Sequence, residues 1–167
     1  MFKKLFKKNN PTKPVEEKVY SPLTGTLVPI EDIPDPTFSE KMIGDGFAVS
    51  PMEGKVVAPI DGEVVQVFPT KHAIGIQTAG GLEILIHIGL DTVNLGGEGF
   101  TTFIEEGDKV QKGDLLVEFD VDTIKNKATS AISPVIITNV EKIIKLEKSS
   151  AQDVIGGESI ILSVSTQ

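Results

Sequence analysis

Short runs of β-branched and aliphatic residues, each ended by a turn residue, are the feature that most constrains this chain. From Val19 onward, runs rich in Val, Ile, Thr and Leu are separated by Gly, Pro and Asp, a pattern typical of strands joined by tight turns. Many such strands predict an all-β fold: an antiparallel β-sandwich or partly closed barrel with short helical turns. The expected strands are 26–29, 48–51, 55–58, 62–68, 73–78, 82–88, 101–103, 115–119, 133–137 and 159–164.

Three segments need a separate interpretation. Residues 120–129 predict a short helical turn, with Asp122 as its N-cap. Residues 140–148 are ambiguous between strand and helix. Residues 107–115 carry two Gly-Asp pairs, which predicts a strand–turn–strand unit.

Length and composition narrow the class of protein. The 167 residues suit one domain, and the chain contains no Cys, which excludes disulfides and thiolate metal sites. No apolar run approaches the length of a membrane-spanning helix, and the N-terminus does not resemble a signal peptide. We therefore expect a cytoplasmic protein.

Charge is distributed unevenly along the chain. The formal net charge is −8, although residues 1–18 hold six Lys against two Glu. The acidic remainder does not suit nucleic acid but does suit a basic protein partner. Because the chain contains no Arg, a guanidinium clamp on a phosphate cannot come from this protein.

The first 18 residues predict a flexible basic tail, followed by one domain over 19–167. Asn and Pro at positions 9–11 and 14 interrupt any regular element. Within residues 1–8, Phe2, Leu5 and Phe6 alternate with four Lys. This segment is either a weak contact for anionic lipid or a disordered solubilising arm.

The two histidines fall in one predicted hairpin. His72 and His87 are the only histidines of the chain, and Ala79-Gly80-Gly81 forms the expected turn between them. With Ala79 and Gly80 as a two-residue loop, His72 would lie directly opposite His87 on one sheet face. A change of one residue in the loop would break this register.

Such a pair is open to four interpretations. A zinc hydrolase would use both imidazoles, with Asp35 or Asp91 as a third ligand, but the chain has no His-x-His pair. A biotinyl- or lipoyl-type carrier would need a tip Lys in a setting that is missing here. A binding module with structural histidines is the third, and nucleophilic phosphoryl transfer through His is the fourth.

A longer motif around the second histidine resembles a known family. The stretch Gly81-Leu-Glu-Ile-Leu-Ile-His-Ile-Gly-Leu-Asp-Thr-Val93 is similar to the phosphorylation-site signature of the glucose-type IIA component of the bacterial sugar phosphotransferase system. The resemblance extends through Gly44-Asp-Gly46, Thr70-Lys-His-Ala73 and Gly97-Glu-Gly-Phe100. It covers about residues 19–164.

The resemblance implies a role for each site residue. His87 would take the phosphoryl group on Nε2, with its other nitrogen bound to a carbonyl near Gly89. His72 would stabilise the group and help donate it, and Thr70 would orient His72. Asp35 and Asp91 would flank the site. An apolar docking ring would comprise Phe38, Ile43, Phe47, Phe68 and Leu85, with Ile74 also standing where some relatives have Phe.

The resemblance also implies partners and the absence of a required cofactor. The donor would be the phosphocarrier HPr and the acceptor the IIB domain of a membrane sugar permease, with further regulatory partners in some relatives. No cofactor is expected beyond a covalent phosphohistidine. Some relatives bind zinc between the two histidines in a partner complex, and a zinc peptidase-like sandwich is the alternative function.

Overall fold

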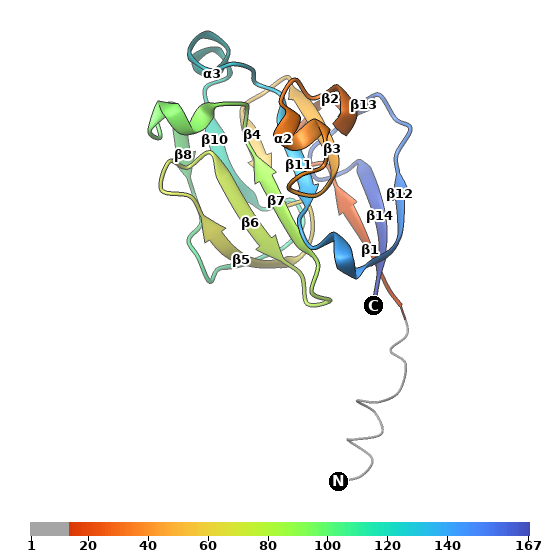
Figure 1. Cartoon of the computed structure of the whole chain (residues 1–167). Coiled ribbons are helices and arrows are strands. Elements are labelled where there is room, and N and C mark those ends of the chain that lie inside the picture. Colours follow the sequence, from red (N-terminus) through yellow and green to blue (C-terminus); the bar gives the residue numbers. More distant parts are fainter. Residues whose placement is uncertain (1–13) are drawn as a thin grey trace, which may run out of the picture.

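The computed structural model describes residues 14–167, and all the strand pairs in this part of the chain are antiparallel. The largest sheet runs in the order β13-β2-β3-β11-β7-β6-β5-β9 (Figure 1). Its strands, in chain order, are β2 (Gly25–Pro29), β3 (Asp45–Pro51), β5 (Gly62–Val67), β6 (Ala73–Gln77), β7 (Glu83–His87), β9 (Lys109–Val110), β11 (Ser133–Ile137) and β13 (Asp153–Val154).

Two three-stranded sheets complete the sandwich, in the orders β1-β14-β12 and β4-β10-β8. The main hydrophobic core lies between the layers, and it includes Val49, Ile86 and Val164 from three different strands. The strands of the small sheets are β1 (Val15–Tyr20), β4 (Lys55–Val57), β8 (Phe100–Thr102), β10 (Leu115–Phe119), β12 (Ile143–Lys148) and β14 (Ile160–Thr166).

A second, smaller apolar cluster lies on the outer face of the large sheet. It is formed by Ile30, Ile33 and Phe38 from η1 (Ile30–Asp32), α2 (Pro36–Ser39) and their junction, packed against residues that include Ala48 and Ile136. Figure 1 shows α2 in front of β3 and β11. Because successive residues of a strand face opposite sides, the outward Ala48 and Ile136 alternate with neighbours that point into the main core.

The predicted all-β sandwich is confirmed, with few short helices and no closed barrel within residues 14–167. The predicted helical turn is α3 (Val121–Lys127), but its N-cap is Asp120, whose carboxylate accepts from the N–H groups of Asp122 and Thr123. The prediction of Asp122 as the N-cap was wrong by two residues. The ambiguous segment contains η3 (Val140–Lys142) and the edge strand β12.

The sheet begins inside the segment that we predicted to be a tail. Strand β1 starts at Val15 and pairs with β14 from Val15↔Thr166 onward. Residues 15–18 therefore belong to the sandwich, because their backbone groups pair with β14 rather than with water. The predicted lipid-contacting stretch, residues 1–8, lies outside the described residues. No helix within residues 14–167 has the length and hydropathy needed to cross a membrane.

The hairpin of β6 and β7 forms as predicted, but in a different register. Ala73, not His72, lies opposite His87. The loop has three residues rather than two: Thr78 N donates to Leu82 O, and Gly81 has φ +91°. A three-residue hairpin loop commonly ends with a residue in this left-handed region, which Gly adopts without strain.

A paired-histidine candidate active site

His72 and His87 lie together despite the shifted register. Their ring centroids are 4.9 Å apart, and the ring planes meet at 79°. In a regular strand, a one-residue shift would place His72 on the opposite face of the sheet from His87. His72 escapes this rule because it precedes β6, directly after Lys71 with φ +64°. Its backbone still joins the hairpin, since Ile88 N donates to His72 O at 2.7 Å.

The tautomer of His87 is determined by its backbone partner. Nδ1 of His87 lies 2.8 Å from Gly89 O. A carbonyl oxygen can only accept, so Nδ1 carries the hydrogen and donates it. In the neutral ring, Nε2 is then left with its lone pair and can act as a nucleophile.

Gly89 can supply this carbonyl only as glycine. Its φ is +75°, and a Cβ at this position would lie 2.6 Å from Thr92 Cγ2 and 2.9 Å from Ser130 O. Its own N–H donates to the buried hydroxyl of Ser133 at 3.1 Å. The backbone turn after β7 is therefore held on both sides, with its carbonyl directed at the imidazole.

Thr70 forms a hydrogen bond with His72. The Thr70 hydroxyl lies 2.7 Å from His72 Nδ1, and the His72 side chain is buried. If the hydroxyl donates, Nε2 of His72 carries a hydrogen and becomes a donor. His72 can then offer an N–H near the free Nε2 of His87.

Burial keeps both imidazoles neutral near pH 7. It lowers the pKa of His72 from 6.5 to about 4, with a smaller contribution from the neighbouring His87. Burial also lowers the pKa of His87, against opposing contributions from the Gly89 hydrogen bond and from the carboxylates of Asp35 and Asp91. A neutral His87 is the form that can attack an electrophile.

The depressed pKa of His72 predicts a pH dependence of stability. In the unfolded chain, this ring takes up a proton as pH falls through about 6.5, but in the fold it does so only near 4. The free energy of unfolding should therefore be fully retained above about pH 7 and should fall as pH drops from about 6.5 to 4. Urea unfolding at several pH values should show this loss, on the order of 3 kcal/mol, and His72→Gln should reduce it. A pH dependence unchanged by that variant would contradict the assignment.

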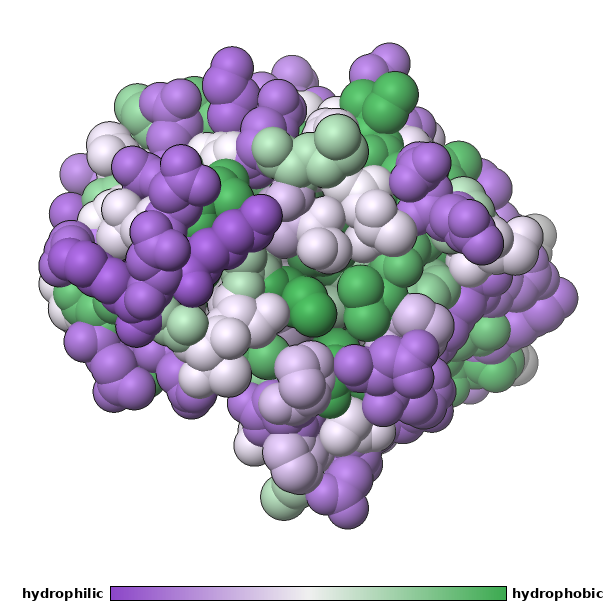
Figure 2. Space-filling view, turned by 90° about the horizontal axis from the view of Figure 1, so that it is seen from above, coloured by the Kyte–Doolittle hydropathy of each residue, from purple (hydrophilic) through white to green (hydrophobic). Residues whose placement is uncertain are grey.

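Aromatic rings border the two imidazoles. Phe38 of α2 lies edge-on to His87, with centroids 5.1 Å apart, and Phe68 lies edge-on to His72 at 5.4 Å. Seen from above, the surface of the molecule is hollowed in the middle, where hydrophobic residues gather inside a mostly hydrophilic rim (Figure 2). A partly apolar surface around the imidazoles suits docking of another protein.

The two predicted flanking carboxylates each accept a hydrogen bond from a threonine. Asp35 is the N-cap of α2 and accepts from Thr37 N at 2.9 Å. Asp91 lies in a left-handed conformation, with φ 61°, and its carboxylate accepts from the hydroxyl of Thr129. Both carboxylates act electrostatically on His87.

The predicted apolar ring is only partly on the site's face of the sheet. Ile43 packs on the outer cluster beside Phe38, and Leu85 is half-buried on the same face as His87, two residues away. Phe47 and Ile74, by contrast, belong to the main core inside the sandwich. Their prediction as docking residues was wrong because alternation along β3 and β6 turns these side chains inward.

Sequence reasoning missed the residues that support the site from behind. Ser133 bonds Gly89, Thr92 Oγ1 donates to Ile88 O at 2.6 Å, and Thr129 bonds Asp91. Ser133 and Thr129 are more than 35 positions from their partners in the sequence, so no local pattern indicates them. The Thr92 contact spans four positions but depends on the turn at Gly89.

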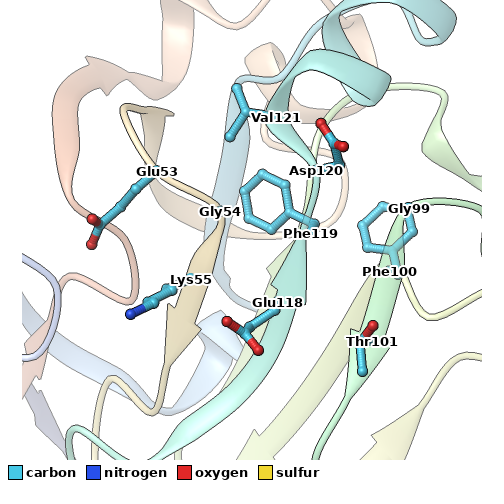
Figure 3. A pocket seen from close by; sticks show the side chains of 10 residues that line it. All are labelled: Glu53, Gly54, Lys55, Gly99, Phe100, Thr101, Glu118, Phe119, Asp120 and Val121. Atoms are coloured by element: carbon cyan, nitrogen blue, oxygen red, sulfur yellow. The ribbon is translucent and has the colours of Figure 1, made fainter.

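An open groove of about 710 Å³ lies away from the histidines. Figure 3 shows its walls, which include Lys55 of β4, Glu118 of β10 and Thr101 of β8. It contains none of the predicted site residues. Among residues 14–167, no three or more His, Cys, Asp or Glu side chains are grouped so that they could hold a metal ion.

Fold and geometry together define a class: a β-sandwich protein with two neutral imidazoles side by side, one of which has its Nδ1 held by a backbone carbonyl. Comparison with known proteins agrees. Residues 17–143 match the family model described as phosphoenolpyruvate-dependent sugar phosphotransferase system, EIIA 1. The chain is 55% identical over 172 residues to a "PTS system glucose-specific EIIA component" of Halalkalibacterium halodurans, covering 100% of this chain and 99% of that protein.

Further relatives agree in sequence and structure. A protein of the same description from Staphylococcus epidermidis is 51% identical over 166 residues, with 98% of each chain covered. The solved structure of glucose permease IIA from Mycoplasma capricolum superposes with a TM-score of 0.80 at 38% identity, covering 89% of this chain and 96% of that one. The chain belongs to the EIIA 1 family of the sugar phosphotransferase system. It is a phosphotransferase that carries a phosphoryl group in sugar uptake, and nothing supports the zinc peptidase alternative.

Proposed function

We propose that His87 is the residue that carries the phosphoryl group, on Nε2. The observation that supports this most is the hydrogen bond between His87 Nδ1 and Gly89 O, which leaves Nε2 as the free lone pair. In the transfer, the N–P bond of the donor's phosphohistidine breaks and a bond from phosphorus to His87 Nε2 forms. The donor's imidazole leaves with its electron pair, and His87 keeps its hydrogen on Nδ1.

The phosphorylated ring needs no proton transfer to form. It becomes an imidazolium that still donates from Nδ1 to Gly89 O, and this hydrogen bond strengthens because its donor is now charged. His72 donates from Nε2 to a phosphoryl oxygen, with Thr70 holding it in that tautomer. Such preorganised donors act on the charge of the group in transfer. We expect no metal or other cofactor to be required.

We infer that the donor is HPr and that the acceptor is the IIB domain of a sugar permease. The partners that the family implies are consistent with the aromatic side chains of Phe38 and Phe68 beside the imidazoles and with the acidic body of the chain, which suits a basic donor. The relatives described as glucose-specific favour glucose as the sugar served. This role fits the expected cytoplasmic location.

Labelling tests the proposal directly. The purified protein is incubated with phosphoenolpyruvate, enzyme I and HPr, and phosphopeptides are mapped by mass spectrometry under mildly alkaline conditions, which preserve phosphohistidine. We expect one phosphoryl group per chain, on His87, in the presence of EDTA. Label on another residue, or labelling that EDTA abolishes, would contradict the proposal.

A further inference from the structure

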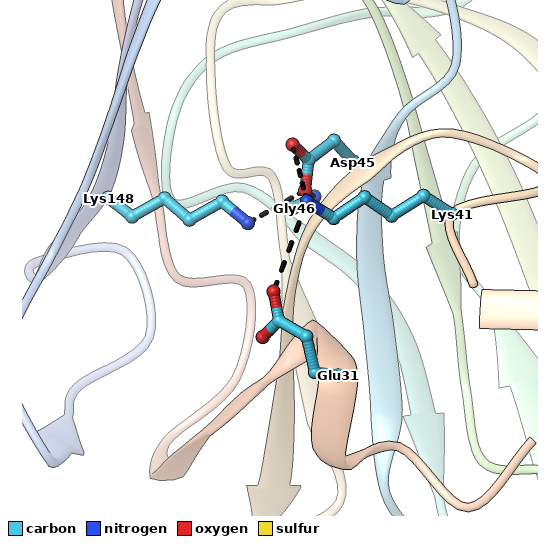
Figure 4. A network of polar contacts seen from close by, with 5 residues as sticks. All are labelled: Glu31, Lys41, Asp45, Gly46 and Lys148. Carbon is cyan, nitrogen blue, oxygen red and sulfur yellow. Dashed lines mark hydrogen bonds and ion pairs between the residues drawn. The ribbon is translucent and has the colours of Figure 1, made fainter. Parts of the chain in front are cut away.

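Asp45, the first residue of β3, joins parts of the fold that are far apart in sequence. Its Oδ1 lies 2.7 Å from Lys148 Nζ, and its Oδ2 lies 3.7 Å from Lys41 Nζ. Lys41 also lies 3.9 Å from Glu31 Oε1. Figure 4 shows Lys41 and Lys148 reaching the carboxylate from opposite sides, with Glu31 below.

The carboxylate of Asp45 is held in place by the backbone on either side of it. Gly44 and Gly46 lie so close to β11 that a Cβ on either would come within 2.0 Å of a backbone oxygen, of Ile137 and Val135 respectively. The same carboxylate accepts from Gly46 N at 2.8 Å. Asp45 is therefore a rigid anchor rather than a mobile surface charge.

Lys41 connects this anchor to the segment that covers His87, and Lys148 connects the anchor to β12. Lys41 lies two residues after the end of α2, with φ +58°, and its N–H donates to Phe38 O at 2.9 Å. Glu31 belongs to η1, at the other end of the same segment. Lys148 comes from β12 in another sheet and also lies 5.6 Å above the Phe47 ring.

We propose that Asp45 is a positioning residue, which is itself fixed by Lys148 and holds residues 30–41 against the sheet through Lys41 so that Phe38 and Asp35 face His87. The inference rests on the proposed function, because its consequence is the rate at which His87 takes the phosphoryl group. The smaller apolar cluster packs residues 30–41 against the sheet, and the ion pairs of Lys41 hold the C-terminal end of this segment.

The Asp45–Lys148 pair is better shielded than an ordinary surface ion pair. The side chains of Asp45 and Lys148 are 23% and 27% exposed, whereas those of Lys145 and Glu147, which pair on the same strand β12, are 67% and 62% exposed. Exposed pairs are screened by salt and contribute little. The Lys145–Glu147 pair therefore provides a matched control.

Amide hydrogen exchange tests the positioning without any phosphoryl transfer. The N–H groups of Phe38, Ser39, Glu40 and Lys41 are all bonded within the segment. In Asp45→Asn and Lys148→Met, we expect their exchange to be about fivefold faster through local opening, with the amides of β7 and β11 unchanged. Lys145→Met should leave all of them unchanged, and Lys148→Arg, which keeps a cation beside Asp45, should restore protection. Equal exchange in wild type, Asp45→Asn and Lys148→Met would overturn the proposal.

The rate of His87 labelling by the phosphorylated donor provides the second measurement. We expect it to fall about fivefold in Asp45→Asn and Lys148→Met, and to be unchanged in Lys145→Met and restored in Lys148→Arg. Faster exchange together with an unchanged labelling rate would overturn the role in transfer. If the wild type itself is not labelled, the proposed function fails, whereas the exchange result still decides whether Asp45 holds the segment.

Discussion

His87→Gln is expected to take up no phosphoryl group from a phosphorylated donor, whereas His72→Gln should take it up and fail to pass it on. The difference between the two variants follows from the hydrogen bond that each histidine makes through its Nδ1. His87 Nδ1 donates to Gly89 O, so Nε2 keeps the lone pair that the proposed function needs, and glutamine has no equivalent lone pair on nitrogen. In the proposed function His72, whose Nδ1 is bonded to Thr70, contacts the phosphoryl oxygens and does not attack phosphorus.

The expected size of the His72 effect comes from losing one preorganised donor. Removal of such a donor typically lowers a transfer rate by about 100-fold or more, so onward transfer should fall by that order while labelling of His87 persists. A rapid-quench assay with the permease's IIB domain as acceptor measures it. Thr70→Val, which keeps the side-chain shape but removes the hydroxyl, should show a weaker form of the same defect. Equal loss of labelling in both histidine variants would contradict these separate roles.

Gly89→Ala is expected to destabilise the protein far more than an alanine at another glycine of similar conformation. A non-glycine residue at φ +75° costs about 1–2 kcal/mol. The new Cβ would also lie 2.9 Å from the backbone oxygen of Ser130, so the turn itself must move. We expect a total loss of about 3 kcal/mol or more in the free energy of unfolding, together with slow labelling because the Gly89 carbonyl no longer meets His87.

Gly96→Ala is the matched control for this prediction. Gly96 has φ +61°, and a Cβ there would have nothing within 4 Å. Its substitution should cost only about 1 kcal/mol, with normal labelling of His87. Chemical denaturation of both variants separates the contribution of backbone conformation from that of crowding. A Gly89→Ala protein as stable as Gly96→Ala would show that the turn after β7 can relax.

Local patterns in the sequence were sufficient for most of the strands and for the turn residues. Alternating apolar residues in 73–78 and 82–88 correctly predicted the hairpin, since burial of one or both strand faces requires particular residues at each position. They did not determine its register. The loop uses three residues because Gly81 takes a positive φ, and a local pattern is equally compatible with a two-residue loop over Ala79 and Gly80.

Local patterns also could not tell which apolar residues lie on the surface around the site. Phe47 and Phe38 are equally hydrophobic in the sequence, yet one fills the main core and the other borders His87. The direction in which a side chain of β3 points matters only once the neighbouring layers are in place. Phe47 lies under Lys148 of β12, whereas Ala48, on the opposite face, packs with Phe38 of α2. The tail boundary was placed too late for a similar reason, since β1 becomes a strand by pairing with β14 at the other end of the chain.

The sequence by itself determined the all-β class, the hairpin with both histidines and, through the motif from Gly81 to Val93, the family. Only the tertiary structure decided how the histidines meet. His72 lies one residue outside the expected register, and it reaches His87 only because the chain bends before β6. Gly89, Ser133 and the Asp45 network act through contacts between distant segments, and such contacts exist only once the sheets have packed.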